Sequence, residues 1–291
     1  MQFWVDSPYL VGFTGGTSVQ RLNTQYQNLI AKKEAKEALK KMRKRLFDLQ
    51  SRLIAEKKNG VLIVFQAMDA AGKDSTIREV FRGLNPLGCG VHSFGKPSAQ
   101  ELSRDYLWRV HQLVPQKGQV TIFNRSHYEE VLVVRVFPEL LEKQCLPTGR
   151  SVEQEMSLRY EAIRNFEKHL SDNGTVIIKF WLNVGLEEQK RRLLRRMNDP
   201  NRYWKHDPND LNMRDKWADF MVAYEALLNE TSRPWAPWYA IPADDKANMR
   251  LMIGSIVEKT LLEMNPQFPQ VSEDNYKGLE SCRARLSGEQ R

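Results

Sequence analysis

Five short apolar segments, each followed by a stretch with helical periodicity, constrain the fold of this chain most. The segments span residues 61–65, 90–94, 120–123, 176–182 and 238–241. A continuous apolar run is typical of a strand buried on both faces of a parallel sheet. Strands that alternate with helices imply right-handed βαβ crossovers. The sequence therefore predicts an α/β fold, with a mostly parallel five-stranded sheet between two layers of helices.

One domain is expected to account for most of the 291 residues. We expect it to span residues 29–265 and to begin with an amphipathic helix over 29–54, where apolar residues recur every three or four positions. Residues 1–28 lack a clear period and predict an irregular N-terminal arm, and residues 266–291 form a C-terminal tail. The amphipathic helix would suit a homo-oligomer, a dimer or tetramer, but packing within one chain explains it equally well.

Three N-terminal caps mark further helices. Ser98 with Glu101 and Ser151 with Gln154 have the spacing of capping boxes, in which a hydroxyl and an acid or amide satisfy backbone N–H groups at the start of a helix. Asp210 precedes the next helical stretch, which ends near residue 228, and is expected to cap it.

The balance of charge favours anionic partners. The formal net charge is +8, which attracts nucleic acid, acidic lipid or a phosphate-rich substrate and does not choose among them. Cys89, Cys145 and Cys282 lie far apart without metal-ligand spacing, so neither a disulfide framework nor a zinc site is indicated. The sequence contains no leader pattern and no apolar run long enough to span a membrane. We therefore expect a cytoplasmic protein that does not contact a membrane.

A phosphate-binding loop is predicted directly after the first strand. Residues 66–76 read Gln-Ala-Met-Asp-Ala-Ala-Gly-Lys-Asp-Ser-Thr and lead into a helical stretch. Backbone N–H groups and a helix N-terminus would surround phosphate oxygens there, and Lys73 would reach the terminal phosphates. The match to the strict G-x-x-x-x-G-K-[ST] pattern is partial, because Ala67 replaces the first Gly and Asp74 the hydroxyl residue. The alternative is an ordinary glycine-containing turn with a surface lysine.

Asp69 is an acid inside a loop that is expected to hold anions. It would repel phosphate unless a cation offsets its charge, and Mg²⁺ is the simplest such cation. Asp69 would then hold the metal or orient the acceptor phosphate, as phosphoryl transfer requires. Alternatively, Asp69 caps the helix that follows.

A second polar motif follows the third strand, where open α/β sheets bind their ligands. Arg125 offers a planar fork for phosphate oxygens, and Asn124 stands where P-loop kinases usually carry a metal-binding Asp. Glu129 and Glu130 add further acids. Structural roles are the alternative: an ion pair at a helix start for Arg125, and packing for His127 and Glu129.

A basic stretch after the fourth strand predicts a lid. Seven Lys or Arg residues lie between residues 190 and 205, and Arg214 follows. The corresponding region of P-loop kinases, here about residues 185–215, closes over the site, excludes water and brings cations to the transferring phosphates. This is more positive charge than a nucleoside triphosphate requires, and a polyanionic chain would use it. A solvated helix face paired with nearby acids is the alternative.

Four segments together resemble the polyphosphate kinase 2 family: residues 66–74, 105–109, 122–129 and 236–243. The resemblance covers about residues 30–265. It implies a P-loop core like that of thymidylate kinase, with Mg²⁺, or Mn²⁺ in its place. It also implies direct transfer of phosphate from inorganic polyphosphate to nucleoside mono- or diphosphates under a helical lid. Asn124, where other branches carry Asp, resembles the branch that accepts both AMP and ADP.

The resemblance also implies roles for single residues. Asp69, Lys73 and Arg125 would be catalytic, with Asp69 binding the metal or activating the acceptor. The nucleotide would contact Asp69, Asn124, Arg125 and Glu129. The polyphosphate chain would contact Ala70, Ala71, Gly72, Lys73, Asp74, Ser75, Arg202, Lys205 and Arg214. The sequence departs from the family at Ala71, Glu130 and His206, where Gly, Asp and Phe are frequent, so loop geometry and lid contacts are expected to differ there.

Two other functions stand beside this prediction. An ATP-dependent P-loop nucleoside or nucleotide kinase would share the fold and differ in its donor. A nucleic-acid-binding protein would use the positive charge, but it would leave Asp69 and Arg125 in one crevice unexplained. We therefore expect no nucleic acid partner.

Overall fold

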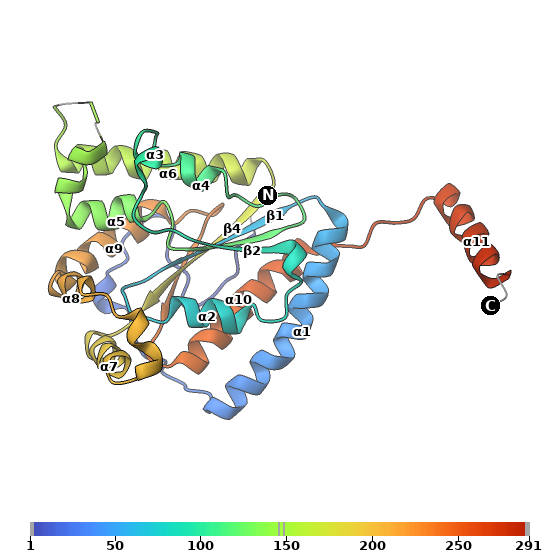
Figure 1. Ribbon diagram of the computed structural model, residues 1–291, viewed down its shortest axis with the longest axis horizontal. Coiled ribbons are helices and arrows are strands. Elements are labelled where there is room, and N and C mark those ends of the chain that lie inside the picture. The colour runs from blue at the N-terminus through green and yellow to red at the C-terminus, as the bar shows by residue number, and fades with distance from the viewer. Residues whose placement is uncertain (1–2, 145, 148, 289–291) are drawn as a thin grey trace.

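A parallel sheet runs through the centre of the molecule (Figure 1). The computed structural model describes residues 3–144, 146–147 and 149–288. Cys145, one of the three cysteines for which neither a disulfide nor a zinc site was expected, lies outside the described residues. In this part of the chain five strands pair in the order β2-β3-β1-β4-β5. Their bounds are Gly60–Gln66 for β1, Cys89–Ser93 for β2, Val120–Asn124 for β3, Thr175–Asn183 for β4 and Trp238–Pro242 for β5. The predicted α/β fold with five parallel strands is confirmed.

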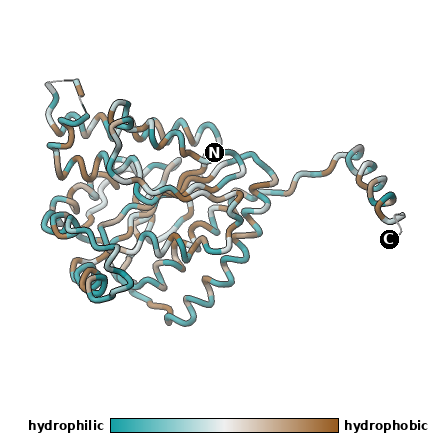
Figure 2. The backbone as a smooth tube through the Cα atoms, in the orientation of Figure 1, coloured by the Kyte–Doolittle hydropathy of each residue, from teal (hydrophilic) through white to brown (hydrophobic). Residues whose placement is uncertain are grey.

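The apolar character of the strands explains the layering. Every residue of β1, β4 and β5 is buried, and the central strands form the hydrophobic band of Figure 2. Val61 pairs with Val120 of β3 on one side and with Val176 of β4 on the other. Strand β2 lies at the edge of the sheet, so Val91 is about half exposed, unlike the residues of the inner strands.

Helices cover both faces of the sheet (Figure 1). One layer contains α1 (Lys32–Glu56), α2 (Lys73–Val80) and α10 (Lys246–Met264), which pack on one another. The other contains α5 (Glu129–Val136), α6 (Val152–Asp172) and α9 (Trp217–Thr231). The remaining helical segments are α3 (Ala99–Leu102), α4 (Trp108–His111), α7 (Leu186–Met197), α8 (Asn209–Asp215), α11 (Glu273–Gly288), and the 3-10 turns η1 (Val19–Arg21), η2 (Pro86–Gly88), η3 (Pro138–Leu140), η4 (Glu142–Gln144) and η5 (Pro200–Lys205).

Helix α1 begins three residues later than predicted. Leu29 precedes it and is 62% exposed. The apolar residues of α1 that are buried against the protein are Leu39, Met42, Leu46, Leu49 and Leu53. Helices α1 and α10 approach closely at Gly254, where an added Cβ would lie 2.6 Å from the sulfur of Met42. The predicted amphipathic helix therefore packs within its own chain along this face.

Two of the three predicted caps are confirmed. Both capping boxes form, with Ser98 starting α3 and Ser151 starting α6. The prediction for Asp210 is wrong, because the segment folds as two helices, α8 and α9, and Asp210 lies inside the first turn of α8. Its carboxylate accepts a hydrogen bond from Arg196 at 2.6 Å instead.

The N-terminal arm is irregular and packs on the edge of the sheet. Leu10 forms an antiparallel bridge with Tyr239 of β5, and the Val11 N–H donates to the carbonyl of Trp238 at 2.9 Å. Val5 and Val19 of the arm are buried. Helix α11, by contrast, stands clear of the body (Figure 1), and its described side chains are exposed. No helix in the described ranges has the length and apolarity needed to cross a membrane.

Candidate active site

A cavity of about 1800 Å³ opens at the carboxyl ends of the strands. The loop after β1, the residues after β3, the α7–η5 region and the start of α10 line it. The predicted site residues that line it are Asp69, Ala70, Gly72, Lys73, Asp74, Ser75, Asn124, Arg125, Glu129, Arg202 and Lys205. Ala71 and Arg214, which were also predicted, are not among the lining residues. The crevice expected between the two motifs therefore exists.

The loop after β1 has the backbone of a phosphate-binding turn. Ala70 (φ +60°) and Gly72 (φ +106°) are both left-handed, a conformation that glycine adopts without strain and alanine does not. Gly72 precedes the first residue of α2, and no side chain caps this helix end. Asp69 is therefore not the helix cap that was left open as an alternative. The free N–H groups of α2 remain available for an anion.

Lys73 is held inside this loop. Its side chain is only 8% exposed, and its ammonium donates to the carbonyls of Ala67 at 2.7 Å and Met68 at 3.4 Å. Burial lowers the pKa of Lys73, and the neighbouring carboxylate of Asp69 opposes that shift. A bound phosphate would offer the ammonium a full negative charge in place of two carbonyl dipoles.

Asp69 and Arg125 join the two motifs. The Arg125 guanidinium donates to Asp69 Oδ1 at 2.8 Å, across the crevice and not at a helix start. Arg125 has a left-handed backbone (φ +62°), which its N–H stabilises by donating to the carbonyl of Phe65 at 3.0 Å. Gln189 of α7 donates to the carbonyl of Asp69 at 3.1 Å. The acid and the guanidinium are thus held in position by β1 and α7.

Glu129 lies deep in the same crevice. Burial raises its pKa, while Arg125 and Lys73 oppose the shift. Glu130, the next residue, also lines the cavity, and its carboxylate pairs with the buried Arg159 at 2.8 Å. Glu129 therefore belongs to the electrostatics of the site, and Glu130 fixes α5 to α6.

Asn124 and Asp74 link the phosphate-binding loop to the lid region. Asn124 Nδ2 donates to Asp74 Oδ1 at 3.0 Å and to Ser93 Oγ at 3.2 Å. The other oxygen of Asp74 lies 3.4 Å from the ammonium of Lys205. Burial would raise the pKa of Asp74, but the Asn124 hydrogen bond and Lys205 hold it below its usual range. Asp74 stands where the usual pattern has a hydroxyl, and it anchors Lys205 here.

The region predicted to form the lid consists of α7, η5 and α8, and most of its cations have acidic partners. Arg191 pairs with Glu188 at 2.6 Å, and Arg202 pairs with Asp199 at 2.7 Å. Arg196 pairs with Asp210, as described above. The Arg196–Asp210 pair is largely buried. The guanidinium groups of Arg191 and Arg202 are exposed, so their ion pairs contribute little to stability. Their guanidinium groups can therefore exchange partners when a stronger anion arrives.

Arg192 has a different role from its neighbours. It is buried, and its guanidinium donates to the carbonyls of Ala71 at 2.6 Å and Ala243 at 2.6 Å. Its Nε donates to Glu188 at 2.6 Å. Arg192 thus ties the phosphate-binding loop to the segment after β5, and this explains why Ala71 is covered.

Arg214 does not line the cavity, but it contacts a residue that holds the backbone of Asp69. Its guanidinium donates to the carbonyl of Leu186 and to Gln189 Oε1, both at 2.8 Å. Gln189 in turn holds the backbone of Asp69. The structure therefore places Arg214 behind Asp69 rather than in the lining of the cavity.

The motifs did not indicate five of the cations that line the cavity: Arg78 of α2, Lys96, Lys143, and Lys246 and Arg250 of α10. Arg250 donates to Ser75 Oγ at 3.1 Å. A signal was present in the sequence, because Lys246 and Arg250 follow the last strand closely and are four residues apart, which places them on one face of a helix. The carboxyl end of that strand lies at the same edge of the sheet as the two motifs.

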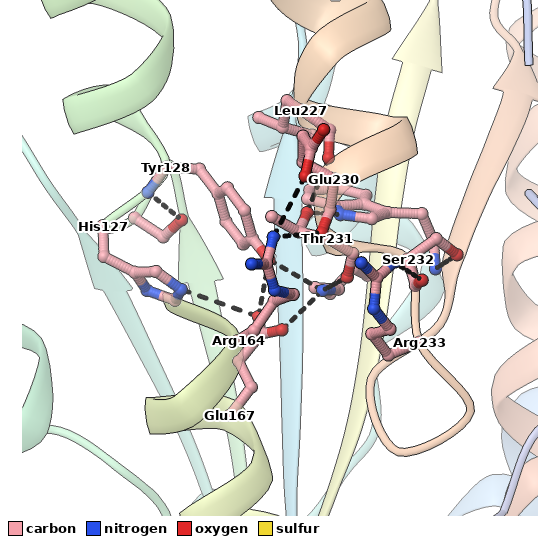
Figure 3. A network of polar contacts seen from close by, with 12 residues as sticks. His127, Tyr128, Arg164, Glu167, Leu227, Glu230, Thr231, Ser232 and Arg233 are labelled. Atoms are coloured by element: carbon pink, nitrogen blue, oxygen red, sulfur yellow. Dashed lines mark hydrogen bonds and ion pairs between the residues drawn. The ribbon is translucent and has the colours of Figure 1, made fainter. Parts of the chain in front are cut away.

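A buried polar network lies behind the second motif (Figure 3). Lys179 of β4 donates to Glu167 of α6 at 2.6 Å, to the hydroxyl of Tyr128 at 2.7 Å and to the carbonyl of Thr231 at 2.9 Å. His127 Nε2 lies 3.6 Å from Glu167, and burial lowers the pKa of His127, which favours the neutral ring. His127 is fully buried, so the structural alternative describes it better than a role in catalysis.

Asp69 meets the needs of a magnesium site. Mg²⁺ typically binds one or two carboxylates and completes its shell with substrate phosphates and water. The Asp69 carboxylate lines the cavity beside Lys73 and is 21% exposed. Among the described residues no cluster of three or more His, Cys, Asp or Glu forms a metal cage. The donor set therefore suits a metal that arrives with phosphate.

Comparison with known proteins identifies the family. Residues 29–269 match the family model described as Polyphosphate kinase 2. The chain is 44% identical to an ADP-polyphosphate phosphotransferase of Rhodopseudomonas palustris, over 88% of this chain and 89% of that protein. It is 48% identical to an AMP/ADP-polyphosphate phosphotransferase of Meiothermus ruber, over 82% and 85%. The crystal structure of polyphosphate kinase 2 from Arthrobacter aurescens superposes with a TM-score of 0.88 at 32% identity, covering 98% of each chain. The chain therefore belongs to the polyphosphate kinase 2 family.

Proposed function

We propose that this chain transfers the terminal phosphate of inorganic polyphosphate to ADP and AMP, reversibly, and so forms ATP. The observation that carries the proposal is the 2.8 Å pair between Asp69 and Arg125, which unites two phosphate-directed motifs in one cation-lined cavity. The names of the relatives from Rhodopseudomonas palustris and Meiothermus ruber support polyphosphate as the donor.

The geometry suggests how these residues divide the work. The loop N–H groups and Lys73 would hold the terminal phosphate of the donor, while Arg125 and Asn124 orient the acceptor phosphate for in-line attack. Arg125 would leave its ion pair with Asp69 and bind phosphate instead, and the Asp69 carboxylate would then be free. Asp69 would then hold Mg²⁺, or Mn²⁺ in its place, which supplies neutralisation of the phosphate charge. Catalysis then consists of positioning and charge stabilisation, without a covalent phosphohistidine.

We further propose that residues 29–265 form the catalytic domain and that residues 185–215 act as its lid. Arg202 and Lys205 line the cavity from the lid side, with Lys205 bound to Asp74. Arg214 would influence the donor site through Gln189. The cytoplasmic location and the homo-oligomer expected from the sequence belong to the same proposal.

Variants of Asp69 and Lys73 test whether this site carries the activity. Asp69→Asn and Lys73→Met are expected to lower kcat for ATP formation from ADP and polyphosphate by at least about a hundredfold, the scale of losing one preorganised electrostatic group. Lys259→Met is the matched control, because Lys259 lies on the exposed side of α10, away from the cavity. Thermal unfolding of each variant checks the fold. Near-normal turnover in Asp69→Asn would contradict the assignment.

A further inference from the structure

Strand β1 ends in a buried amide. The six residues before Gln66 are glycine or apolar, whereas Gln66 is polar, fully buried and paired with Trp181 of β4. An amide in such a place lowers stability unless its hydrogen bonds are made. Gln66 directly precedes the phosphate-binding loop, but it is not among the residues that line the cavity. Any part that it plays in the site must therefore pass through the groups that it bonds.

The Gln66 amide holds both ends of the turn between β3 and α5. In the orientation assigned from its hydrogen-bond network, its oxygen accepts from the Ser126 N–H at 3.2 Å and from the Ser126 hydroxyl at 3.1 Å. Its NH2 group then donates to Glu129 Oε1 at 2.9 Å. The Tyr128 N–H donates to Ser126 Oγ at 3.2 Å, which closes the turn on itself. Gln66 thus fixes the backbone of Ser126 and the carboxylate of Glu129 together.

The same turn begins with Arg125, and the same strand holds it. The Arg125 N–H donates to the carbonyl of Phe65 at 3.0 Å, so consecutive residues of β1 bond consecutive residues of the turn. The left-handed backbone of Arg125 (φ +62°) is a conformation that persists only where the surrounding structure holds it. The direction of the Arg125 side chain therefore depends on these contacts with β1.

Glu129 faces the charged groups of the site. Arg125 from its own turn and Lys73 from α2 act on it as cations, and Asp69 from the loop after β1 and Tyr224 from α9 face it as well. Glu129 and Asp69 are the two acids that act on Arg125. In the proposed reaction Arg125 leaves Asp69 and binds the acceptor phosphate. Glu129 is then the carboxylate that still stabilises the guanidinium in its place.

We propose that Gln66 is a positioning residue for phosphoryl transfer: it holds the Glu129 carboxylate, and Glu129 keeps Arg125 aligned on the acceptor phosphate. The inference rests on the proposed function and adds to it the means by which β1 controls the acceptor side of the site. Lys73, which would hold the donor, is fixed by the carbonyls of Ala67 and Met68 instead. Loss of the Gln66 amide should therefore affect the acceptor and not the donor.

The first variant is Gln66→Met, which keeps the length of the side chain and removes its hydrogen-bonding groups. The KM for ADP is expected to rise about tenfold, the scale of losing one hydrogen bond to a charged group. The KM for polyphosphate should stay close to the wild-type value. Gln50→Met is the matched control, because Gln50 is a fully buried amide of α1 that bonds the backbone of Asn85 outside the cavity. It should lose stability and keep the wild-type KM for ADP.

An exchange of the two side chains separates positioning from a loss of packing. Gln66→Glu alone sets two carboxylates against each other and should lower kcat/KM for ADP by at least about tenfold. The double variant Gln66→Glu with Glu129→Gln again contains one amide and one carboxylate, and it should recover most of the lost activity. A double variant no more active than Gln66→Glu would overturn the positioning role.

Direct binding separates this inference from the proposed function. Equilibrium dialysis of ADP against the protein without polyphosphate should show about tenfold weaker binding to Gln66→Met than to wild type. Equal binding and equal KM for ADP in the two proteins would overturn the role of Gln66 while leaving the transfer reaction intact, as would equal rises in KM for ADP and for polyphosphate. Failure of wild-type protein to form ATP from polyphosphate would overturn the proposed function, and the role of Gln66 in transfer with it.

Discussion

Two lysines beside the phosphate-binding loop have opposite surroundings. The Lys73 ammonium is satisfied by two carbonyls, and Asp69 lies close to it. Lys246 faces Arg192 and Arg195 from α7 and Arg250 from its own helix, with Glu188 as an opposing charge. Burial, followed by the charges of Arg192 and Arg250, lowers the pKa of Lys246 to about 8. Its charge therefore changes close to neutral pH.

The titration of Lys246 predicts a pH dependence of donor binding. Below this pKa the side chain is cationic and attracts polyphosphate; above it the charge is lost, although bound phosphate raises the pKa and extends the cationic range. The KM for long-chain polyphosphate should therefore rise between about pH 7 and about pH 9. Initial rates across this range measure the effect. In Lys246→Met the rise should be smaller, and an identical profile in both proteins would contradict the role of Lys246.

At the residue scale, the motifs and the order of the strands predicted which residues lie together in the site. They predicted the role of each side chain less well. Asp69 and Arg125 were expected in one crevice because both follow strands of a parallel sheet, and the structure brings them within 2.8 Å. The roles of His127 and Glu129 stayed open, since burial is not readable from a short motif. Lys246 follows the last strand closely, but this spacing alone does not show that α10 packs beside the loop, so Lys246 was missed.

The buried network of Figure 3 ties β4, α6 and the turn after β3 together. Glu167→Gln would leave the ammonium of Lys179 in the core without a carboxylate. Breaking a buried pair in this way is expected to lower the free energy of unfolding by about 3–5 kcal/mol. Urea or thermal unfolding measures the loss.

A neighbouring pair on the same helix supplies the control. Lys168 and Asp172 form an exposed ion pair of α6, and Lys168→Ala should cost no more than about 1 kcal/mol. A double variant with Glu167→Gln and Lys179→Met should recover part of the stability, since it removes the uncompensated charge. Equal losses for Glu167→Gln and Lys168→Ala would contradict the account of the network.

At the element scale, periodicity and capping residues predicted which helices and strands exist better than where each helix begins and ends. All five strands begin and end within one residue of their expected bounds. The break between α8 and α9 was not predicted, because the apolar pattern continues across it and nothing local marks the stop. Asp210 looked like a cap in sequence, whereas the nearby Arg196 recruits its carboxylate into an ion pair that joins α7 to α8.

The two ends of the chain contribute unequally to the stability of the whole molecule. From residue 267 to the end of α11 the described side chains are all exposed. Removing residues 271–291 should therefore change the free energy of unfolding by no more than about 0.5 kcal/mol, as for surface changes in general. Chemical unfolding of full-length and truncated protein measures this. A loss of several kcal/mol on truncation would show that α11 packs on the protein in solution.

The N-terminal arm behaves differently because its contacts are tertiary. It lacks periodicity, yet the Ala240 N–H donates to the carbonyl of Tyr9 at 2.8 Å, and Val5, Val11 and Val19 are buried. Apolar residues spaced irregularly along a chain do not reveal which surface they cover. The fold class was predictable because it follows from the order of strands and helices, and the coverage of β5 by the arm was not.

The formation of ATP by purified protein tests the central claim most directly. Wild-type protein is mixed with Mg²⁺ and long-chain polyphosphate, and with ADP or AMP in separate reactions, after adenylate kinase contamination has been excluded. EDTA is the control. We expect EDTA-sensitive formation of ATP from ADP and also from AMP. No transfer to either acceptor, together with phosphate transfer from ATP to a nucleoside or nucleotide, would contradict the account and indicate an ATP-dependent kinase.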